Sequence, residues 1–300
     1  MPLTHVRTFR VRHYECDAYG YVKYTNYLNY MQEAAFDASA AAGYDLARYE
    51  MMGRHWLVRE TDIEYLHPLR YGNSVQVKTW VADFRRVRSR RAYELRLDGS
   101  GELVARASTD WVFLDKVTER PVTIPSEMMH AFFPEGVPEQ APPRSRFPPA
   151  PTPPPDVFRL RRRVEWGNID TAQHVNNAVY LAYLEECSVQ AAAAHGWSQA
   201  RMQREGFAVV ARRHQIEYRQ PGVLGDELEL VTWVSGLERT DACHPFTAVR
   251  HYTVTRVSDG ALLARARMLW ETADVKTEQP IRIPDTFLAD LAPNAAGRLP

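Results

Sequence analysis

The chain has 300 residues, of which 45% are apolar and 25% charged, a composition typical of folded globular proteins. This length suits two domains of about 130 residues, each large enough to bury its own core. Lysine plus arginine and aspartate plus glutamate number 37 each. The chain therefore has no net charge that would draw it to nucleic acid or to an anionic membrane surface.

The three cysteines, Cys16, Cys187 and Cys243, show no Cys-x-x-Cys spacing, and we expect reduced thiols. No apolar run is as long as that of a signal peptide or a membrane-spanning helix. The histidines lack metal-ligand spacing, and no phosphate-binding or dinucleotide-binding motif occurs. We therefore expect a soluble cytoplasmic protein without metal or cofactor that binds neither nucleic acid nor membrane.

The first 133 residues predict an α+β domain. Residues 7–14 form a strand pattern, and residues 26–42 carry an apolar stripe at helical spacing that ends at Gly43. The many alanines of this helix would let a sheet approach it closely. Residues 74–81 alternate apolar and polar side chains, and glycines supply turns further on. The pattern predicts one strand, one long helix and about four antiparallel strands.

Residues 134–155 contain ten prolines and separate two similar halves. Such a segment favours an extended conformation, so it predicts either a semi-rigid strap or a disordered tether. The predicted organisation is a domain over 1–133, a linker over 134–155 and a second domain over 156–300.

The second domain repeats the first. Residues 17–81 reappear at 170–234 with a constant offset of 153, so that Asp17 recurs as Asp170 and Glu33 as Glu186. Residues 158–166 and 179–195 repeat the strand and helix patterns. After a gain of six residues near 240, the match continues at an offset of 159. Two copies indicate a fused dimer, because solenoids need more and shorter repeats.

Two loop segments carry a family resemblance. Residues 17–28 resemble the hotdog-fold thioesterases of the 4-hydroxybenzoyl-CoA type. Residues 166–177 are similar to the catalytic segment of the acyl-acyl-carrier-protein thioesterases, which are also tandem hotdogs, and residues 76–81 and 106–112 resemble first-repeat strands of that family. The resemblance implies two hotdog domains, each a long helix wrapped by an antiparallel sheet, in an intramolecular pseudo-dimer that could form homo-oligomers.

The same resemblance implies a hydrolase of fatty acid metabolism that acts on acyl-CoA or acylated acyl carrier protein. Hotdog dimers place two sites between copies, so the chain could hold two unequal sites. Competing functions are a hotdog hydratase or dehydratase acting on acyl thioesters, and a non-catalytic acyl-CoA-binding sensor. A sensor would usually need a DNA-binding segment, and no such pattern occurs.

The chemistry of thioester hydrolysis selects the candidate residues. Unpaired amides at a helix N-terminus stabilise an oxyanion, which favours the amides of Val22 to Tyr24 or of Val175 to Asn177. A carboxylate one loop turn earlier, Asp17 or Asp170, could attack the thioester carbon or activate water, or could simply cap the helix. The resemblance assigns catalysis to Asp170.

Neighbouring polar residues have two interpretations each. His174 could donate to the oxyanion or orient Asp170, while Asn176 and Asn177 could bind the thioester oxygen or cap the helix. Ala172 departs from the Asp-x-Asn-x-His pattern of the plant-type enzymes, and in the first copy Tyr21 replaces the histidine.

A glutamate on the long helix could serve as a second acid or base, and two adjacent positions are possible for it. The plant-type pattern places it at Glu186, which pairs with Glu33 in the first copy, whereas the single-domain type places its acid one position earlier, at Gln32 or Glu185. A glutamate in the middle of a helix is otherwise an ordinary surface residue.

A basic hairpin is the last candidate. Residues 85–91 contain five arginines. At the corresponding place the second copy has the sequence Glu238-Arg239-Thr240-Asp241. Arg88 and Arg90 could bind the 3′-phosphate of coenzyme A or the acidic face of a carrier protein, or could only solvate the hairpin.

Overall fold

The computed structural model describes residues 1–136, 144, 146–238 and 247–296. It divides the chain into two compact units, Met1–Arg146 and Phe147–Pro300. No helix within these described ranges is long and apolar enough to cross a membrane.

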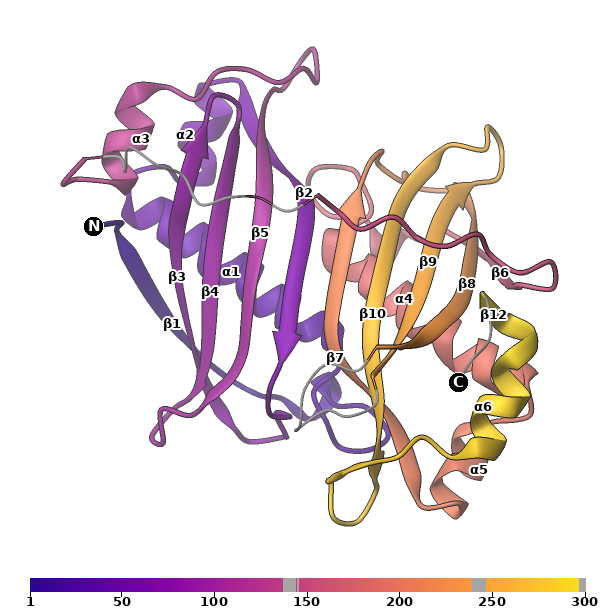
Figure 1. The fold of residues 1–300 in the computed structure, drawn as a ribbon. Coiled ribbons are helices and arrows are strands. Elements are labelled where there is room, and N and C mark those ends of the chain that lie inside the picture. The colour runs from indigo at the N-terminus through magenta and orange to yellow at the C-terminus, as the bar shows by residue number, and fades with distance from the viewer. Residues whose placement is uncertain (137–143, 145, 239–246, 297–300) are drawn as a thin grey trace. The chain divides into compact units, whose positions relative to one another are not determined.

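Unit 1 is a five-stranded antiparallel sheet with one long helix against it (Figure 1). The sheet order is β1-β3-β4-β5-β2. Its elements are β1 (Thr4–Arg10), η1 (His13–Glu15), α1 (Tyr24–Ala41), α2 (Leu46–Met51), β2 (Arg54–Tyr65), β3 (Ser74–Arg85), β4 (Arg88–Leu97), β5 (Leu103–Asp115) and α3 (Ser126–Phe132).

Unit 2 has the same order of elements up to its fifth strand and then continues further. The sheet order is β7-β10-β9-β8, with β6 antiparallel to β8 on the other side. Its elements are β6 (Phe158–Arg163), η2 (Trp166–Asn168), α4 (Asn177–Ala194), α5 (Gln199–Arg204), β7 (Phe207–Tyr218), β8 (Glu227–Glu238), β9 (Thr247–Arg256), β10 (Leu262–Asp274), β11 (Pro280–Ile281), α6 (Asp285–Leu291), η3 (Ala292–Asn294) and β12 (Ala295–Ala296).

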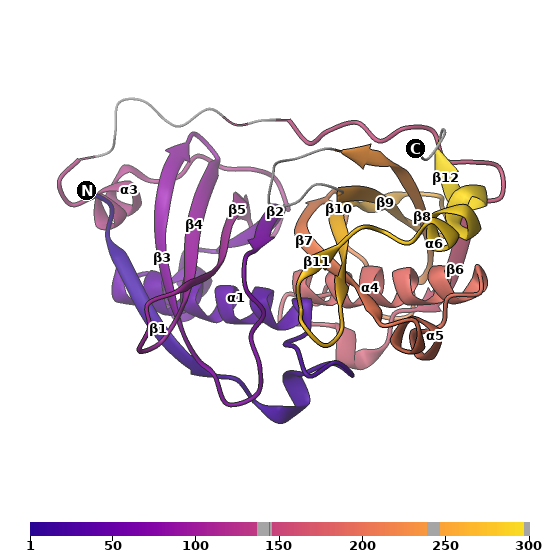
Figure 2. The same ribbon diagram turned by 60° about the horizontal axis from the view of Figure 1, so that its bottom comes forward.

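Each long helix packs its apolar stripe on one face of its own sheet, which we call the inner face (Figure 2). In α1 the stripe includes Leu28, Met31 and Ala34, none more than 1% exposed. Small side chains such as Ala34 allow the close approach that the sequence predicts. The predicted α+β class is confirmed in both units.

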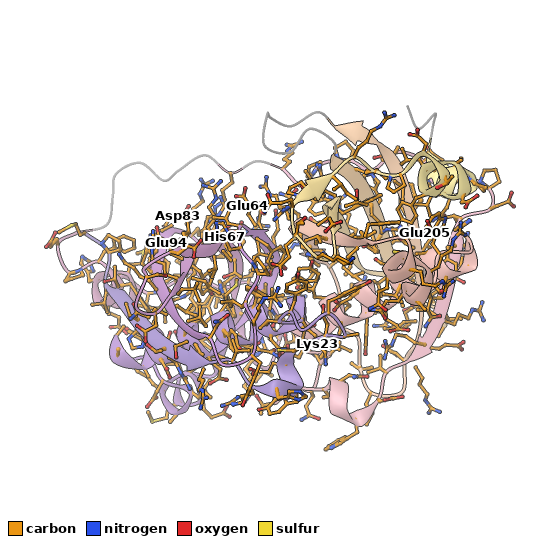
Figure 3. The ribbon with its side chains drawn as sticks, turned by 90° about the horizontal axis from the view of Figure 1, so that it is seen from below. Lys23, Glu64, His67, Asp83, Glu94 and Glu205 are labelled. Carbon is orange, nitrogen blue, oxygen red and sulfur yellow. The ribbon has the colours of Figure 1, made fainter. Side chains whose placement is uncertain are left out.

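The opposite, outer face of the unit 1 sheet is polar and holds one residue of the predicted linker. Arg144 pairs with Asp83 on β3 and with Asp110 on β5, whose Oδ2 lies 3.3 Å from Arg144 Nη1. All three side chains are at most 10% exposed. In Figure 3, Asp83 and Glu94 lie on the side of unit 1 away from Lys23, which precedes α1. Residues 137–143 and 145 of the predicted linker lie outside the described residues.

Candidate functional site

The loop that begins at Asp170 joins η2 to α4 and is closed by backbone hydrogen bonds. The Asp170 N–H donates to His174 O at 3.0 Å, and the Gln173 N–H donates to Asp170 O at 2.9 Å. Gln173 has φ +63°, a left-handed conformation that Gly20 adopts in the equivalent loop of unit 1 with φ +80°. The loop therefore presents the Asp170 side chain directly before a helix.

Asn176 connects the Asp170 carboxylate to the first turn of α4. Asp170 Oδ1 accepts the Ala172 N–H at 2.9 Å, while Oδ2 accepts Asn176 Nδ2 at 3.3 Å. The other amide atom, Asn176 Oδ1, accepts the Ala178 N–H at 2.8 Å and so caps the helix. Of the two predicted roles of Asn176, the structure shows the helix cap, and the same side chain also donates to Asp170.

Two of the three amides predicted to face the substrate already have acceptors. The Val175 N–H donates to Gly222 O at 2.9 Å, and the Asn176 N–H donates to Asn168 O at 3.0 Å. Within the described residues, the Asn177 N–H at the helix start donates to no protein group. The donor left for an oxyanion is therefore Asn177 rather than Val175. In unit 1 the Val22 N–H is likewise bonded, to Leu69 O at 2.8 Å.

A buried tyrosine on each long helix binds the loop whose carbonyl group accepts the Val175 or Val22 N–H. Tyr180 Oη accepts the Gly222 N–H at 3.2 Å, and Tyr27 Oη accepts the Leu69 N–H at 3.2 Å. Burial raises the pKa of both phenols, so they stay protonated. A Cβ at Gly222 would lie 3.1 Å from Tyr180 Oη and from Val175, which explains a glycine there. The sequence carries a signal for this contact, because the helix tyrosine of the first copy recurs in the second at the offset of 153.

The Asp17 loop has the same closure and different surroundings for its carboxylate. Asp17 Oδ1 accepts the N–H groups of Tyr19 and Tyr21, both at 2.9 Å. Burial raises the pKa of the Asp17 carboxyl, and these two N–H bonds oppose the rise. Lys23 replaces Asn176, and its Nζ donates to Tyr14 O at 3.3 Å. The residue of unit 1 that stands at the position of Asn176 thus donates to a backbone carbonyl group and not to the Asp17 carboxylate.

The two adjacent helix glutamates of unit 2 face different surroundings. Glu186 is exposed and accepts Gln190 Nε2 at 2.6 Å on the helix surface. Glu185 is partly buried. Burial raises the pKa of Tyr252, and the charge of Glu185 adds to this rise; the Tyr252 hydroxyl lies 2.7 Å from Ser188 Oγ inside the unit. Glu33, the counterpart of Glu186, is also exposed, 3.4 Å from Arg7.

Part of the positive charge of the basic hairpin is neutralised by a carboxylate of the same sheet. Arg90 donates to both carboxylate oxygens of Asp110, at 2.7 and 3.1 Å, and this pairing raises its pKa. Arg88 is exposed. Residues 239–241 of the second hairpin lie outside the described residues. Of the two predicted docking arginines, Arg88 is exposed, whereas the Arg90 side chain is 20% exposed and paired with Asp110.

Thiols and metal-ligand clusters contribute nothing to this site in the part of the chain that the structure describes. Cys16 and Cys187 are free thiols, and burial raises the pKa of Cys187 to about 12. Cys243 lies outside the described residues. No group of three histidine, cysteine, aspartate or glutamate side chains in the described ranges could hold a metal ion.

Two family models together cover most of the chain. Residues 2–132 match the acyl-ACP thioesterase N-terminal domain, and residues 164–291 match the thioesterase-like superfamily. The predicted resemblance is confirmed. The order of the two halves is reversed, however, because residues 17–28 suggested the 4-hydroxybenzoyl-CoA type for the first half and residues 166–177 suggested the acyl-acyl-carrier-protein type for the second.

Individual relatives are distant. The palmitoyl-acyl carrier protein thioesterase of Arabidopsis thaliana is 26% identical over 277 residues, which are 89% of this chain and 63% of that protein. The chain thus spans less than two thirds of this relative's length. The putative acyl-CoA thioesterase YneP of Bacillus subtilis is 28% identical over 116 residues, which are 39% of this chain and 83% of that protein.

A solved structure supports the fold. The putative oleoyl thioesterase of Lactobacillus plantarum superimposes with a TM-score of 0.73 at 19% identity, covering 90% of this chain and 96% of that one. At this identity the similarity concerns the fold alone, and it confirms the predicted hotdog architecture.

Proposed function

We propose that this chain, which joins an acyl-ACP thioesterase N-terminal domain to a domain of the thioesterase-like superfamily, hydrolyses acyl thioesters. The thiol that leaves is coenzyme A or the phosphopantetheine of an acyl carrier protein. The relatives named above carry both kinds of substrate in their names.

One observation carries the assignment of the site to unit 2. The Asp170 carboxylate is held by Asn176, whose other amide atom caps the helix that presents the Asn177 N–H. A carboxylate and a helix-terminal donor are thereby placed on one rigid support, as general-base and oxyanion chemistry require.

In the proposed reaction Asp170 accepts a proton from a water molecule as the water oxygen bonds to the thioester carbon. The carbonyl oxygen becomes an oxyanion, stabilised by the Asn177 N–H and the positive end of the α4 dipole. When the oxyanion collapses, the carbon–sulfur bond breaks, and the thiolate takes up the proton held by Asp170, which returns to its carboxylate form. His174 assists by donating to the oxyanion or by orienting Asp170.

Asp170→Asn tests the proposal. The amide cannot take the proton, so we expect kcat for thiol release to fall at least about a hundredfold. The substitution keeps the shape of the side chain, and an unchanged melting temperature would show that the fold is kept. Release is measured over short, long and aromatic acyl-CoAs and over the same acyl groups on carrier protein.

Asp17→Asn is the matched control. Because Lys23 stands where unit 2 has Asn176 and donates to Tyr14 O, we expect kcat to fall several times less in Asp17→Asn than in Asp170→Asn. If Asp17→Asn abolishes turnover while Asp170→Asn keeps it, the catalytic site belongs to unit 1. Consumption of enoyl-CoA without thiol release would instead identify a hydratase.

A further inference from the structure

The connection from β7 to β8 is hydrogen-bonded to the start of α4. Gly222 of this connection binds the Val175 N–H and Tyr180 Oη, as described above. A further contact comes from Tyr218, the last residue of β7, whose Oη donates to Asn177 O at 3.0 Å. The centroids of the Tyr218 and Tyr180 rings are 5.5 Å apart, with an interplanar angle of 75°. A packed aromatic ring thus brings a hydroxyl to the residue whose N–H is the proposed oxyanion donor.

This hydroxyl binds one side of a peptide group that is also held on its other side. The Asn177 carbonyl and the Ala178 N–H belong to the same planar peptide group. Tyr218 Oη donates to the carbonyl, and the N–H donates to Asn176 Oδ1 at 2.8 Å. The first peptide group of α4 therefore has one side-chain partner from β7 and another from the loop before the helix.

Asn176 extends the connection to the Asp170 carboxylate. Its Nδ2 donates to Asp170 Oδ2 at 3.3 Å, while its Oδ1 is the acceptor just described. The reversed amide would face the Ala178 N–H with a donor and the carboxylate with an acceptor, so its neighbours fix its orientation. The Tyr218 hydroxyl, the peptide group and the Asn176 amide thus donate in turn, toward Asp170. Hydrogen bonds in such a chain polarise and strengthen one another.

Unit 1 has the tyrosine with a different residue between helix and carboxylate. Tyr65 stands at the position of Tyr218 and is buried. The position of Asn176 is taken by Lys23, which forms no side-chain cap on α1 and donates to Tyr14 O. An ammonium group accepts no hydrogen bond, so Lys23 cannot link a peptide N–H to a carboxylate as Asn176 does. Tyr65 is therefore a matched control for Tyr218.

We propose that Tyr218 is a positioning residue for the Asp170 carboxylate. It acts through the first peptide group of α4 and through Asn176, so that the carboxylate and the Asn177 N–H keep a fixed separation. This inference rests on the proposed thioesterase function, in which both groups must stay close to the reacting carbonyl. Tyr218 belongs to a strand, and a strand holds such groups more precisely than a loop does.

Tyr218→Phe tests the inference, because it removes one oxygen and keeps the ring. We expect kcat for thiol release to fall at least about fivefold, the effect of losing one uncharged hydrogen bond. KM should change by less than about twofold, since the hydroxyl binds the protein and not the substrate. Tyr65→Phe should change neither constant by more than about twofold. An unchanged kcat in folded Tyr218→Phe, or an equal fall in Tyr65→Phe, overturns the proposal.

A double-mutant cycle separates positioning from a general loss of stability. Asn176→Ala already interrupts the chain, so adding Tyr218→Phe to it should lower kcat by less than a further factor of about two. A merely structural role would instead lower kcat by the same factor in both backgrounds, which overturns the proposal. Full kcat in Asn176→Ala also overturns it, because the chain runs through that side chain.

Hydrogen exchange measured by NMR tests the chain without turnover. Amides of the first helical turn have no acceptor within the helix, so we expect Asn176 Oδ1 to protect the Ala178 N–H in the wild-type protein. Tyr218→Phe should speed its exchange at least about fivefold. The Trp197 N–H after the other end of α4, which donates to Ala192 O at 2.9 Å, should keep its rate. An unprotected Ala178 N–H in the wild type, or a rate that Tyr218→Phe leaves unchanged, overturns the proposal.

Failure here and failure of the hydrolase proposal give different results. Thiol release by the wild type, with unchanged kcat and exchange in Tyr218→Phe, removes only the positioning inference. Faster exchange at Ala178 in Tyr218→Phe, without thiol release by the wild type from any acyl thioester, removes only the hydrolase assignment.

Discussion

Asp17 and Asp170 show how one residue type at equivalent positions acquires different properties. Asp17 binds two backbone N–H groups through one oxygen, and burial raises its pKa. Asp170 uses both oxygens, one for a backbone N–H and one for Asn176. A carboxylate held at both oxygens has a defined orientation, which a general base needs. The donor to the second oxygen of Asp170 is Asn176, and Lys23 stands at the equivalent position of unit 1.

The register of the helix glutamate can be tested at the same scale. Glu186 is exposed and accepts a hydrogen bond from Gln190 on the helix surface, so Glu186→Gln should change kcat by no more than about twofold, as for an exposed helix pair. Glu185 is partly buried, and its charge adds to the rise that burial causes in the pKa of Tyr252. If it serves as the second acid or base, Glu185→Gln should lower kcat about a hundredfold. Steady-state thiol release is measured for both variants. A larger fall in kcat for Glu186→Gln than for Glu185→Gln would place the acid at Glu186.

At the scale of elements, long-range backbone bonds set where the helices begin. The sequence predicts starts at 26 and 179, whereas α1 begins at Tyr24 and α4 at Asn177. The preceding N–H groups donate to the 3-10 turns, from Lys23 to Glu15 O and from Asn176 to Asn168 O. Helical periodicity does not reveal such bonds, because the acceptors lie outside the helix.

The two helices differ in capping. Asn176 caps α4 through its side chain, but Lys23 forms no side-chain cap on α1. Asn176→Ala should therefore lower the free energy of unfolding by about 1 kcal/mol, and it should also lower kcat because Asp170 Oδ2 loses its donor. Urea unfolding and thiol release measure the two effects.

Lys23→Ala is the control for that pair of measurements, with little change expected in either. An Asn176→Ala protein with reduced stability and full kcat would leave Asn176 as a cap only.

At the scale of the whole molecule, buried histidine makes stability depend on pH. His214 is 2% exposed, and burial lowers its pKa from 6.5 to about 3. The unfolded chain takes up a proton below pH 6.5, whereas the folded chain does not until about pH 3. The contribution of His214 to stability is therefore complete above pH 6.5 and is lost as the pH falls toward 3. At pH 5 the loss is about 2 kcal/mol relative to pH 8.

His214→Thr, which introduces the residue of the equivalent position in unit 1, isolates this effect. Urea unfolding at pH 8 and pH 5 should show a smaller pH dependence in the variant, even if the variant is less stable at both. An identical pH dependence would mean that folding does not shift the pKa of His214.

The sequence by itself determined the features that depend on local pattern: the α+β class, the long alanine-rich helices and the loop of each copy with its aspartate before a helix. These follow from periodicity and spacing, which the chain carries locally. Tertiary structure alone decided which groups remain available. Val175 donates to Gly222, Arg90 binds Asp110, and Tyr218 donates to the Asn177 carbonyl group. Strand pairing and loop contacts bring these partners together from distant parts of the chain, and no local pattern specifies that pairing.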